Sequence, residues 1–309
     1  MLTLLHGMLP TSRDTRRFAT GAVWLGLLAC GPRFPTAAQS PSASSRQVTF
    51  ENAGVTLAGE VTYPAGRGPF PGVVLVHGSG PVTRVGNAPL VELFTGLGFA
   101  VLAYDKRGTG ASGGGYRGVG PLNSDSMLAL LGGDAMAGAR LLQADARIDR
   151  DRVGMAGGSQ AGWVIARAMR DGTFRFFVAL SGPTVSVGEE IYFSTLFEHD
   201  LSRPLFAADS LMALFDGFKG YDPLADLRRG SAIGLYLFGG RDRSIPVRRS
   251  LDVLTMVNRE FSAARYTVVL YPNADHSLVD TDAGTFLPIR DTIAPWLVRA
   301  GLLPASPRR

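Results

Sequence analysis

The sequence predicts an α/β protein whose mostly parallel central sheet is covered by helices on both faces. From Gln47 onward, short β-branched runs alternate with longer segments of helical periodicity, which is the pattern of βαβ units. Runs such as GVVLVHG (72–78) are apolar at nearly every position, as strands buried on both faces are. With 309 residues and 46% hydrophobic composition, the chain is long enough to build the core that such a sheet requires.

The expected elements begin with a hairpin over residues 47–64, whose turn is the stretch ENAG (51–54). Asn123 or Ser124 is the expected N-cap of the longest helix. The remaining elements are expected in the order strand 72–78, helix 89–99, strand 100–105, helix 123–145, strand 151–157, helix 160–170, and strands 174–182, 233–240 and 265–272.

Residues 184–230 interrupt this alternation, because they contain no strand-like run. A helical insertion between consecutive strands indicates a lid, about 184–230, with additional core as the alternative interpretation of an aromatic-rich helix pair. The apolar residues that recur there at helical spacing are Tyr192, Phe193, Leu196, Phe197, Leu211, Leu214, Phe215 and Phe218.

The N-terminus has the features of an export signal. Three arginines precede the apolar run 18–30, which is too short to span a bilayer and is followed at once by polar, Pro-rich sequence. We expect residues 1–30 to be a signal peptide, of lipoprotein or ordinary secretory type, and residues 31–46 to be a linker. Met8 is an alternative start. The expected location is periplasmic or extracellular, with anchoring to a membrane if the protein is a lipoprotein.

Two processing sites remain open. LLAC, which ends at Cys30, resembles the lipobox of bacterial lipoproteins, in which the cysteine is lipidated and attaches the mature protein to a membrane. PTAAQS instead offers small residues for an ordinary cleavage after Ala38. Cys30 is the single cysteine of the chain, so an internal disulfide and a thiol nucleophile in the folded domain are both excluded.

Charge and composition exclude other classes. The net charge of +5 comes from scattered arginines without a basic stripe that interleaves aromatics, so nucleic acid is not expected as a partner. The sequence has neither His, Cys and carboxylate residues at metal-ligand spacing nor a phosphate-binding Gly-rich loop in the right context. No metal or cofactor is therefore expected.

The stretch VGMAGGSQAGW (153–163) places Ser159 where a strand meets a helix. A nucleophile on such a sharp turn is held in strained backbone geometry above the sheet, and the residues two positions away on either side must be small. Gly157 and Ala161 occupy those positions. Small residues there also serve helix–sheet packing, so this stretch alone does not decide between the two roles.

A serine nucleophile needs a general base, and the chain has four histidines. His6 lies in the expected signal peptide, His77 in the turn after a strand, and His199 in the expected lid. His276 follows the last strand of the expected sheet and precedes the final helix. We therefore expect His276 to reach the sheet edge at which Ser159 lies.

The imidazole in turn needs a buried carboxylate that fixes its tautomer. Asp242 follows the strand 233–240 at the same edge, although a turn aspartate or a helix N-cap is the alternative interpretation. The order Ser159, Asp242, His276 is one of the known chain orders of such a triad. Other acidic residues are worse placed or weaker candidates: Asp275, Asp280 and Asp282.

Two backbone N–H groups are expected to bind the developing oxyanion. Gln160 follows the nucleophile at a helix N-terminus, where free N–H groups and the helix dipole favour negative charge. Ser79, in the HGSGP loop after the strand 72–78, is the expected second donor, and His77 is expected to orient that loop.

Five motifs in order, VVLVHGSGP, YDKRGTGAS, GGSQAGW, GGRDRSIP and ADHS, make residues 47–300 resemble the α/β-hydrolase superfamily. Within it the sequence is most similar to secreted bacterial esterases and to the dienelactone-hydrolase-like and serine-aminopeptidase-like groups. The resemblance implies an α/β-hydrolase fold over residues 47–305. One position departs from the pattern, since Ala161 stands where the elbow usually has glycine.

The activity that follows is cleavage of carboxylic esters through an acyl-enzyme, with Ser159 as nucleophile, His276 as base and Asp242 as its support. A peptidase or amidase acting on small peptides would use the same triad, and a non-catalytic binding protein on this fold is a further alternative. The expected partner is a small-molecule ester or peptide, bound in pockets built from lid and loop side chains.

Two charged clusters lie outside the expected triad. In proteins that the chain resembles, the Asp and Arg of the YDKRGTGAS turn brace the loop beneath the site, so a structural role is expected for the turn formed by Asp105, Lys106 and Arg107. Glu189 and Glu190 are expected on a solvated lid face, with contact to a cationic substrate group, such as a peptide N-terminus, as the alternative.

Overall fold

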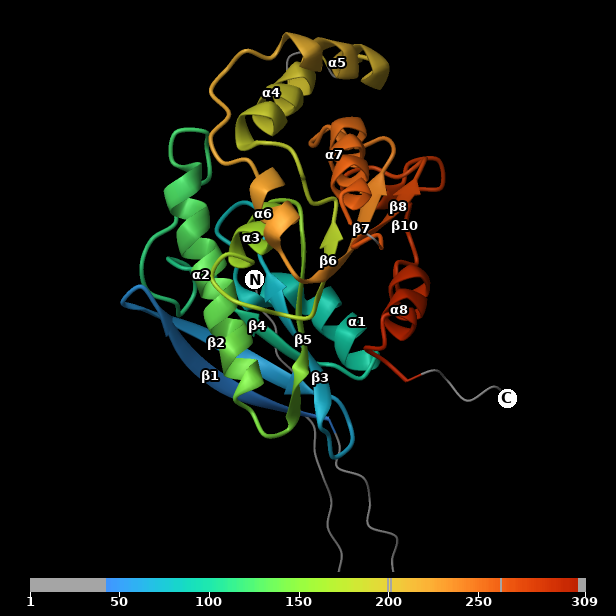
Figure 1. The fold of residues 1–309 in the computed structure, drawn as a ribbon. Helices are drawn as coiled ribbons and strands as arrows, with labels where there is room; N and C mark the ends of the chain where they lie inside the picture. The colour runs from blue at the N-terminus through green and yellow to red at the C-terminus, as the bar shows by residue number, and fades with distance from the viewer. Residues whose placement is uncertain (1–42, 199, 201, 262, 305–309) are drawn as a thin grey trace, which may run out of the picture. The chain divides into compact units, whose positions relative to one another are not determined.

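The central feature of the fold is an eight-stranded sheet with the order β1-β2-β4-β3-β5-β6-β7-β8 (Figure 1). The structure is a computed structural model that describes residues 43–304 except 199, 201 and 262. The β1–β2 and β2–β4 pairs are antiparallel, and the other pairs of this sheet are parallel. The prediction of a mostly parallel sheet is confirmed.

The elements alternate along the chain as predicted. The strands are β1 (Ser44–Asn52), β2 (Val55–Tyr63), β3 (Phe70–Val76), β4 (Ala100–Tyr104), β5 (Ile148–Gly158), β6 (Phe176–Leu180), β7 (Ile233–Gly239), β8 (Tyr266–Tyr271), and the short pair β9 (Val279–Asp280) and β10 (Thr285–Phe286). The helices are η1 (Arg84–Asn87), α1 (Ala88–Gly96), α2 (Ser124–Gln143), α3 (Ala161–Ala168), α4 (Val187–Glu198), α5 (Leu205–Leu211), η2 (Met212–Leu214), α6 (Leu224–Arg229), α7 (Val247–Arg259) and α8 (Arg290–Arg299).

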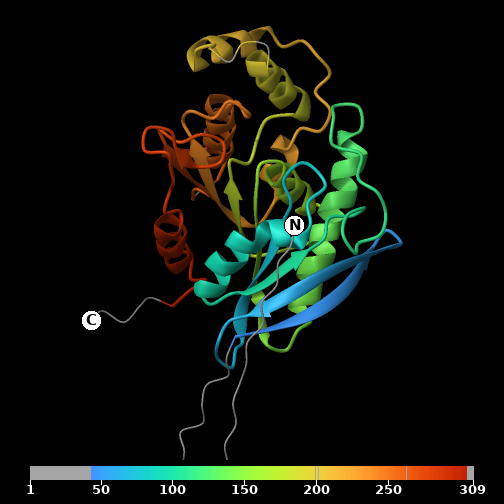
Figure 2. The same ribbon diagram turned by 180° about the vertical axis from the view of Figure 1, so that it is seen from behind.

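Helices cover both faces of the sheet. Helices α2, α3, α6 and α7 pack on one face, and α1 and α8 pack on the other, which Figure 2 shows from behind. Successive side chains of β3 point into the two opposite cores, with Val74 and Val76 in one and Val73 and Leu75 in the other. A strand with a core on each side needs an apolar residue at every position, which explains the continuous run in the sequence.

The N-terminal hairpin begins earlier than expected. Ser44 pairs with Tyr63, so the last three residues of the expected linker 31–46 belong to the sheet. The turn of the hairpin uses Ala53 and Gly54, both with positive φ. The expected signal peptide, Cys30 and the rest of that linker up to residue 42 lie outside the described residues, and so does His199. No helix in the described ranges is both long and apolar enough to cross a membrane.

The insertion between β6 and β7 is helical, as predicted, and contains α4, α5, η2 and α6. In Figure 1, α4 and α5 lie beyond the ends toward which β6 and β7 point. Phe193, Phe197, Ala208 and Met212 form a small buried core of their own. The helical stretch expected through Phe218 ends earlier.

The end of η2 accounts for that difference. After Leu214 the backbone of Phe215 is extended (φ −66°, ψ 116°), and the turn-forming pair Asp216–Gly217 follows. Leu214 and Phe218 are left 68% and 65% exposed. The expected second helix is therefore shorter and lies further toward the N-terminus, as α5 and η2.

Candidate active site

Ser159 occupies the turn between β5, which ends at Gly158, and α3, which begins at Ala161. Its φ is +57°, in the left-handed region that residues other than glycine rarely adopt. A Cβ on Gly157 would lie 2.2 Å from the carbonyl oxygen of Val76 and 2.7 Å from the Cβ of Ala161. Close approach to the neighbouring strand and to the helix therefore requires a glycine beside this turn.

The other two glycines of this stretch differ from each other. A Cβ on Gly162 would lie 2.8 Å from the backbone of Gly182, so glycine lets α3 pack against the loop after β6. A Cβ on Gly158 would meet its nearest neighbour, the carbonyl oxygen of Leu180, at 3.5 Å. That is an ordinary contact, and space alone does not require glycine at position 158.

The structure brings Asp242 and His276 together. His276 Nδ1 donates to Asp242 Oδ2 at 2.8 Å, and the Asp242 side chain is fully buried. The other carboxylate oxygen of Asp242 accepts the backbone N–H groups of Ser244 (2.7 Å) and Ile245 (3.0 Å). The backbone N–H groups thus fix the orientation of the carboxylate. The carboxylate in turn fixes the imidazole, whose Nε2 makes no hydrogen bond to Asp242 and is available as a base.

The competing carboxylates have other partners. Asp275 accepts the backbone N–H groups of Ser277 and Val279 and so closes its own loop. Asp282 pairs with Arg241, and Asp280 accepts backbone N–H groups of the next turn. In the described part of the chain, Asp242 is the carboxylate that hydrogen-bonds the His276 ring.

Ser159 and His276 both line a pocket of about 510 Å³. Its wall is mostly apolar and comes from α1, the end of β6 and the segment 276–290. The lining residues are Pro89, Leu90, Leu93, Gly158, Ser159, Leu180, His276, Ser277, Leu278, Phe286, Leu287, Pro288, Ile289 and Arg290. Substrate pockets are expected from lid and loop side chains; this pocket is lined by loop residues and α1, and none of its residues belongs to 184–230.

Electrostatics around His276 favour its protonated form. Burial acts to lower its pKa, but the hydrogen bond and charge of Asp242, together with the charge of Glu190, raise the pKa of His276 above the ordinary 6.5. Burial raises the pKa of Glu190 to about 7, and the nearby Asp242 adds to that rise while His276 opposes it. Glu190, on α4, is therefore the group of the insertion that acts on the Asp242–His276 pair.

The two backbone N–H groups expected to bind the oxyanion, those of Ser79 and Gln160, are free to donate to a ligand oxygen. Among the described residues, neither the backbone N–H of Ser79 nor that of Gln160 takes part in a hydrogen bond. The loop that carries Ser79 lies against the nucleophile turn, since a Cβ on Gly78 would be 3.9 Å from Ser159 Cβ. His77 Nε2 bonds the carbonyl oxygen of Tyr104 at 2.6 Å, and burial lowers the pKa of His77 to about 4. His77 is thus a neutral residue that fixes the loop.

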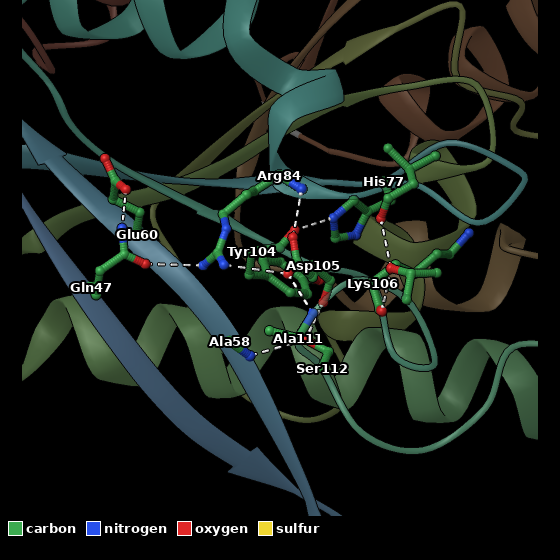
Figure 3. Close-up of polar contacts among 12 residues, drawn as sticks. Gln47, Ala58, Glu60, His77, Arg84, Tyr104, Asp105, Lys106, Ala111 and Ser112 are labelled. Atoms are coloured by element: carbon green, nitrogen blue, oxygen red, sulfur yellow. Dashed lines mark hydrogen bonds and ion pairs between the residues drawn. The ribbon is translucent and has the colours of Figure 1, made fainter.

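Asp105 and Arg107 brace the structure beneath the site, as expected. Asp105 accepts the backbone N–H groups of Arg84 and Ala111, each at 2.9 Å (Figure 3). Arg107 makes a buried two-point ion pair with Asp134, at 2.6 and 2.7 Å. Lys106 behaves differently, because its ammonium contacts both the Ser79 loop and Gln160. Sequence reasoning missed this contact, which joins positions far apart in the chain.

Glu189 is not on a solvated face. It is buried and accepts Ser186 Oγ at 2.7 Å and Arg249 Nη1 at 2.8 Å, so it ties the insertion to α7. The expectation of solvent exposure is wrong for this residue, because an arginine from another element reaches it. Within the described ranges no three His, Cys, Asp or Glu side chains form a group that could hold a metal ion.

A model of the prolyl oligopeptidase family matches residues 89–298, more than half of the chain. The chain belongs to the prolyl oligopeptidase family. The matched segment includes Ser159, Asp242 and His276. The central sheet of the protein is that of the α/β-hydrolase fold.

The chain is also similar to individual esterases and to a peptidase. Esterase EstD of Thermotoga maritima is 45% identical over 69 residues, which cover 19% of this chain and 17% of that esterase. The structure of an esterase of Pyrococcus furiosus has a TM-score of 0.62 at 18% identity, covering 83% of this chain and 91% of that one. The acylaminoacyl peptidase of Pyrococcus horikoshii has a TM-score of 0.61 at 15% identity, covering 87% of this chain and 43% of that one. The chain thus matches less than a fifth of the length of the curated esterase.

Proposed function

We propose that this member of the prolyl oligopeptidase family is a carboxylesterase that acts through an acyl-enzyme on Ser159. The observation that carries the proposal is the hydrogen bond between Asp242 and His276, made at the wall of the pocket that also contains Ser159. A buried carboxylate, an imidazole and a serine on a left-handed turn are the parts of a Ser-His-Asp triad.

In the first half-reaction, His276 Nε2 takes the proton of Ser159 Oγ as the oxygen attacks the ester carbonyl carbon. The carbonyl oxygen becomes an oxyanion that accepts the N–H groups of Ser79 and Gln160. The tetrahedral intermediate then collapses, the C–O bond to the alcohol breaks, and His276 gives the proton to the leaving alcohol. Water repeats the sequence with His276 as base, so the acid is released and Ser159 regains its proton.

The choice of ester rests on the pocket. Its wall is built mainly from leucine, isoleucine, proline and phenylalanine side chains, which favour an apolar acyl or alcohol group by burying its surface. Two of the similar proteins are esterases by name. We therefore expect esters with an apolar group of medium length to be better substrates than acetates.

A second candidate is a peptidase or amidase with the same triad. Membership in the prolyl oligopeptidase family and the fold shared with an acylaminoacyl peptidase favour it. Matched p-nitrophenyl ester and p-nitroanilide substrates with the same acyl group separate the two. A kcat/KM ratio that favours the ester far beyond the intrinsic reactivity difference supports the esterase, and a ratio that favours the anilide supports the peptidase.

The test of the triad is Ser159→Ala in the full-length protein, assayed with p-nitrophenyl esters of increasing chain length. We expect turnover to fall by about 10⁴-fold or more with an unchanged melting temperature, because no other group replaces the nucleophile. Undiminished turnover by pure, folded variant would exclude the proposal. If the wild-type protein binds esters without turning them over, it is a non-catalytic binding protein on this fold.

We further propose that the protein is exported and that Cys30 is lipidated. The arginines before an apolar run ending in LLAC support this proposal. Expression in a bacterial host with radiolabelled palmitate tests it. Label and membrane association that disappear in Cys30→Ser support lipidation, whereas unlabelled, exported protein with a new N-terminus after Ala38 supports ordinary cleavage.

A further inference from the structure

Lys106 carries a buried positive charge directly behind the two expected oxyanion donors. Its side chain is 1% exposed, and its ammonium donates to the carbonyl oxygen of Gly78 at 2.8 Å, to that of Gly80 at 3.0 Å and to Gln160 Oε1 at 3.1 Å. The ammonium also lies 3.6 Å from the centre of the Tyr116 ring. One cation therefore joins the loop after β3 to the first residue after the nucleophile.

The peptide between Gly78 and Ser79 explains why this contact matters. In a trans peptide the C=O and the N–H point in opposite directions, so fixing the oxygen of Gly78 also fixes the direction of the Ser79 N–H. The same loop contacts the nucleophile turn, because a Cβ on Gly78 would be 3.3 Å from the carbonyl oxygen of Gly158. Holding the carbonyl oxygens of both Gly78 and Gly80 leaves the Ser79 N–H little freedom to rotate.

Gln160 is held in the same way. Its side-chain oxygen accepts the Lys106 ammonium and also the hydroxyl of Tyr116 at 3.2 Å. The Gln160 side chain is buried, and its backbone N–H is the second expected donor. Lys106 thus contacts the residues on both sides of the place where the oxyanion would form.

The charge of Lys106 is not neutralised by a carboxylate in the described part of the chain. Asp105, the adjacent residue, is bound to Arg84 and Ala111, and Asp134 is bound to Arg107. The other titratable groups that face Lys106 are His77, which is neutral, and Tyr116. Burial lowers the pKa of Lys106 to about 7, so its charge is costly to keep. Such a costly group at a site is expected to serve the reaction.

We propose that Lys106 is a positioning residue of the oxyanion hole, which aims the Ser79 and Gln160 N–H groups and stabilises the oxyanion with its positive charge. The inference rests on the proposed function. Charge directed at the place where negative charge develops lowers the barrier more than it lowers the energy of bound substrate. Lys106 is therefore expected to act on kcat rather than on KM.

The test compares Lys106→Met, Lys106→Arg and the control Arg84→Met in the full-length protein. Methionine matches the four-atom apolar stem of lysine and removes the donor and the charge. Arg84 is a nearby cation on η1 that contacts Asp105 and Gln47 but not Gly78, Gly80 or Gln160. We expect K106M to lower kcat about 10- to 100-fold with KM within about threefold, and R84M to keep both within about threefold.

The pH profile supplies a readout that a purely structural role would not change. Wild-type kcat is expected to decline as pH rises through the Lys106 pKa of about 7, because the ammonium loses its charge. K106R keeps its charge to high pH, so that decline should disappear even if K106R is slower overall. If K106M does not fold, this comparison of K106R with wild type decides the question alone.

The outcomes separate this inference from the proposed function. Ser159→Ala that is inactive, together with K106M whose folded fraction retains wild-type kcat, would leave the triad standing and overturn the role of Lys106. An unchanged alkaline decline in K106R would overturn it as well. Ser159→Ala that retains activity would instead overturn the proposed function itself.

Discussion

His276 Nδ1 donates a 2.8 Å hydrogen bond to Asp242 Oδ2 across 34 residues of sequence. The two residues follow neighbouring parallel strands, β7 and β8, so the sheet brings their loops to one edge. Backbone N–H groups bind the second oxygen of Asp242, so the carboxylate is held with Oδ2 facing His276. This hydrogen bond fixes the orientation of a loop imidazole that is still 28% exposed.

Replacing Asp242 by Asn tests that relationship. Asparagine keeps the size but removes the charge that stabilises the imidazolium, so we expect kcat to fall about 10³- to 10⁴-fold. Because the Asp242 charge helps to raise the pKa of His276, the acid limb of kcat/KM should move to lower pH. Activity requires neutral His276, so a lower pKa extends activity toward acid. A variant with wild-type kcat and an unmoved acid limb would show that Asp242 does not support His276.

Glu190→Gln should move the acid limb of the kcat/KM pH profile in the same direction as Asp242→Asn, but by a smaller amount. The charge of Glu190 raises the pKa of His276, so its removal should shift the acid limb to lower pH by less than about one unit. We expect kcat at high pH to stay within about threefold of wild type, because Glu190 does not hydrogen-bond the imidazole. A pH titration of kcat/KM with a p-nitrophenyl ester measures this shift. A limb that moves toward higher pH would contradict the arrangement.

The pocket wall predicts which residues set chain-length preference. Leu93→Trp should fill the space beside α1 and lower kcat/KM for an octanoate about tenfold or more relative to an acetate. Phe206→Ala is the control, since Phe206 lies on α5, is 72% exposed and does not line the pocket. The opposite result, with F206A altering the chain-length preference and L93W leaving it unchanged, would place the substrate under the insertion.

The buried ion pair between Arg107 and Asp134 predicts a loss of stability rather than of chemistry. The two side chains are 4% and 1% exposed, and Asp134→Asn would leave a buried arginine without its counter-charge. We expect a decrease of about 3–5 kcal/mol in the free energy of unfolding. Urea denaturation measures it, and kcat per folded molecule should stay within about threefold. A loss below about 1 kcal/mol would mean that water or a neighbour solvates Arg107.

Much of the fold and of the candidate site could be predicted because the strands are recognisable in the sequence and the candidate residues directly follow them. Parallel strands end at one edge, so Ser159, Asp242 and His276 could be placed together from the strands that precede them. That placement needed no knowledge of side-chain packing. The sharp turn at Ser159 could be predicted as well, because few sequences other than those with small residues around the serine allow such a turn.

The parts that the sequence did not predict depend on contacts between distant positions. Lys106 and Gln160 are 54 residues apart, and Glu189 and Arg249 are 60 apart, so neither pair leaves a local pattern. The pocket wall was missed for a related reason. It combines α1 with the segment 286–290, and which helix flanks the nucleophile is set by how the faces of the sheet are covered.

Labelling with a fluorophosphonate probe, followed by mapping of the adduct, tests the central claim most directly. We expect a stoichiometric adduct on Ser159 in the native protein. Labelling should be lost in S159A and much slower in D242N. An adduct on another residue, or a native protein that does not react at all, would contradict the assignment of Ser159, His276 and Asp242 as the catalytic triad.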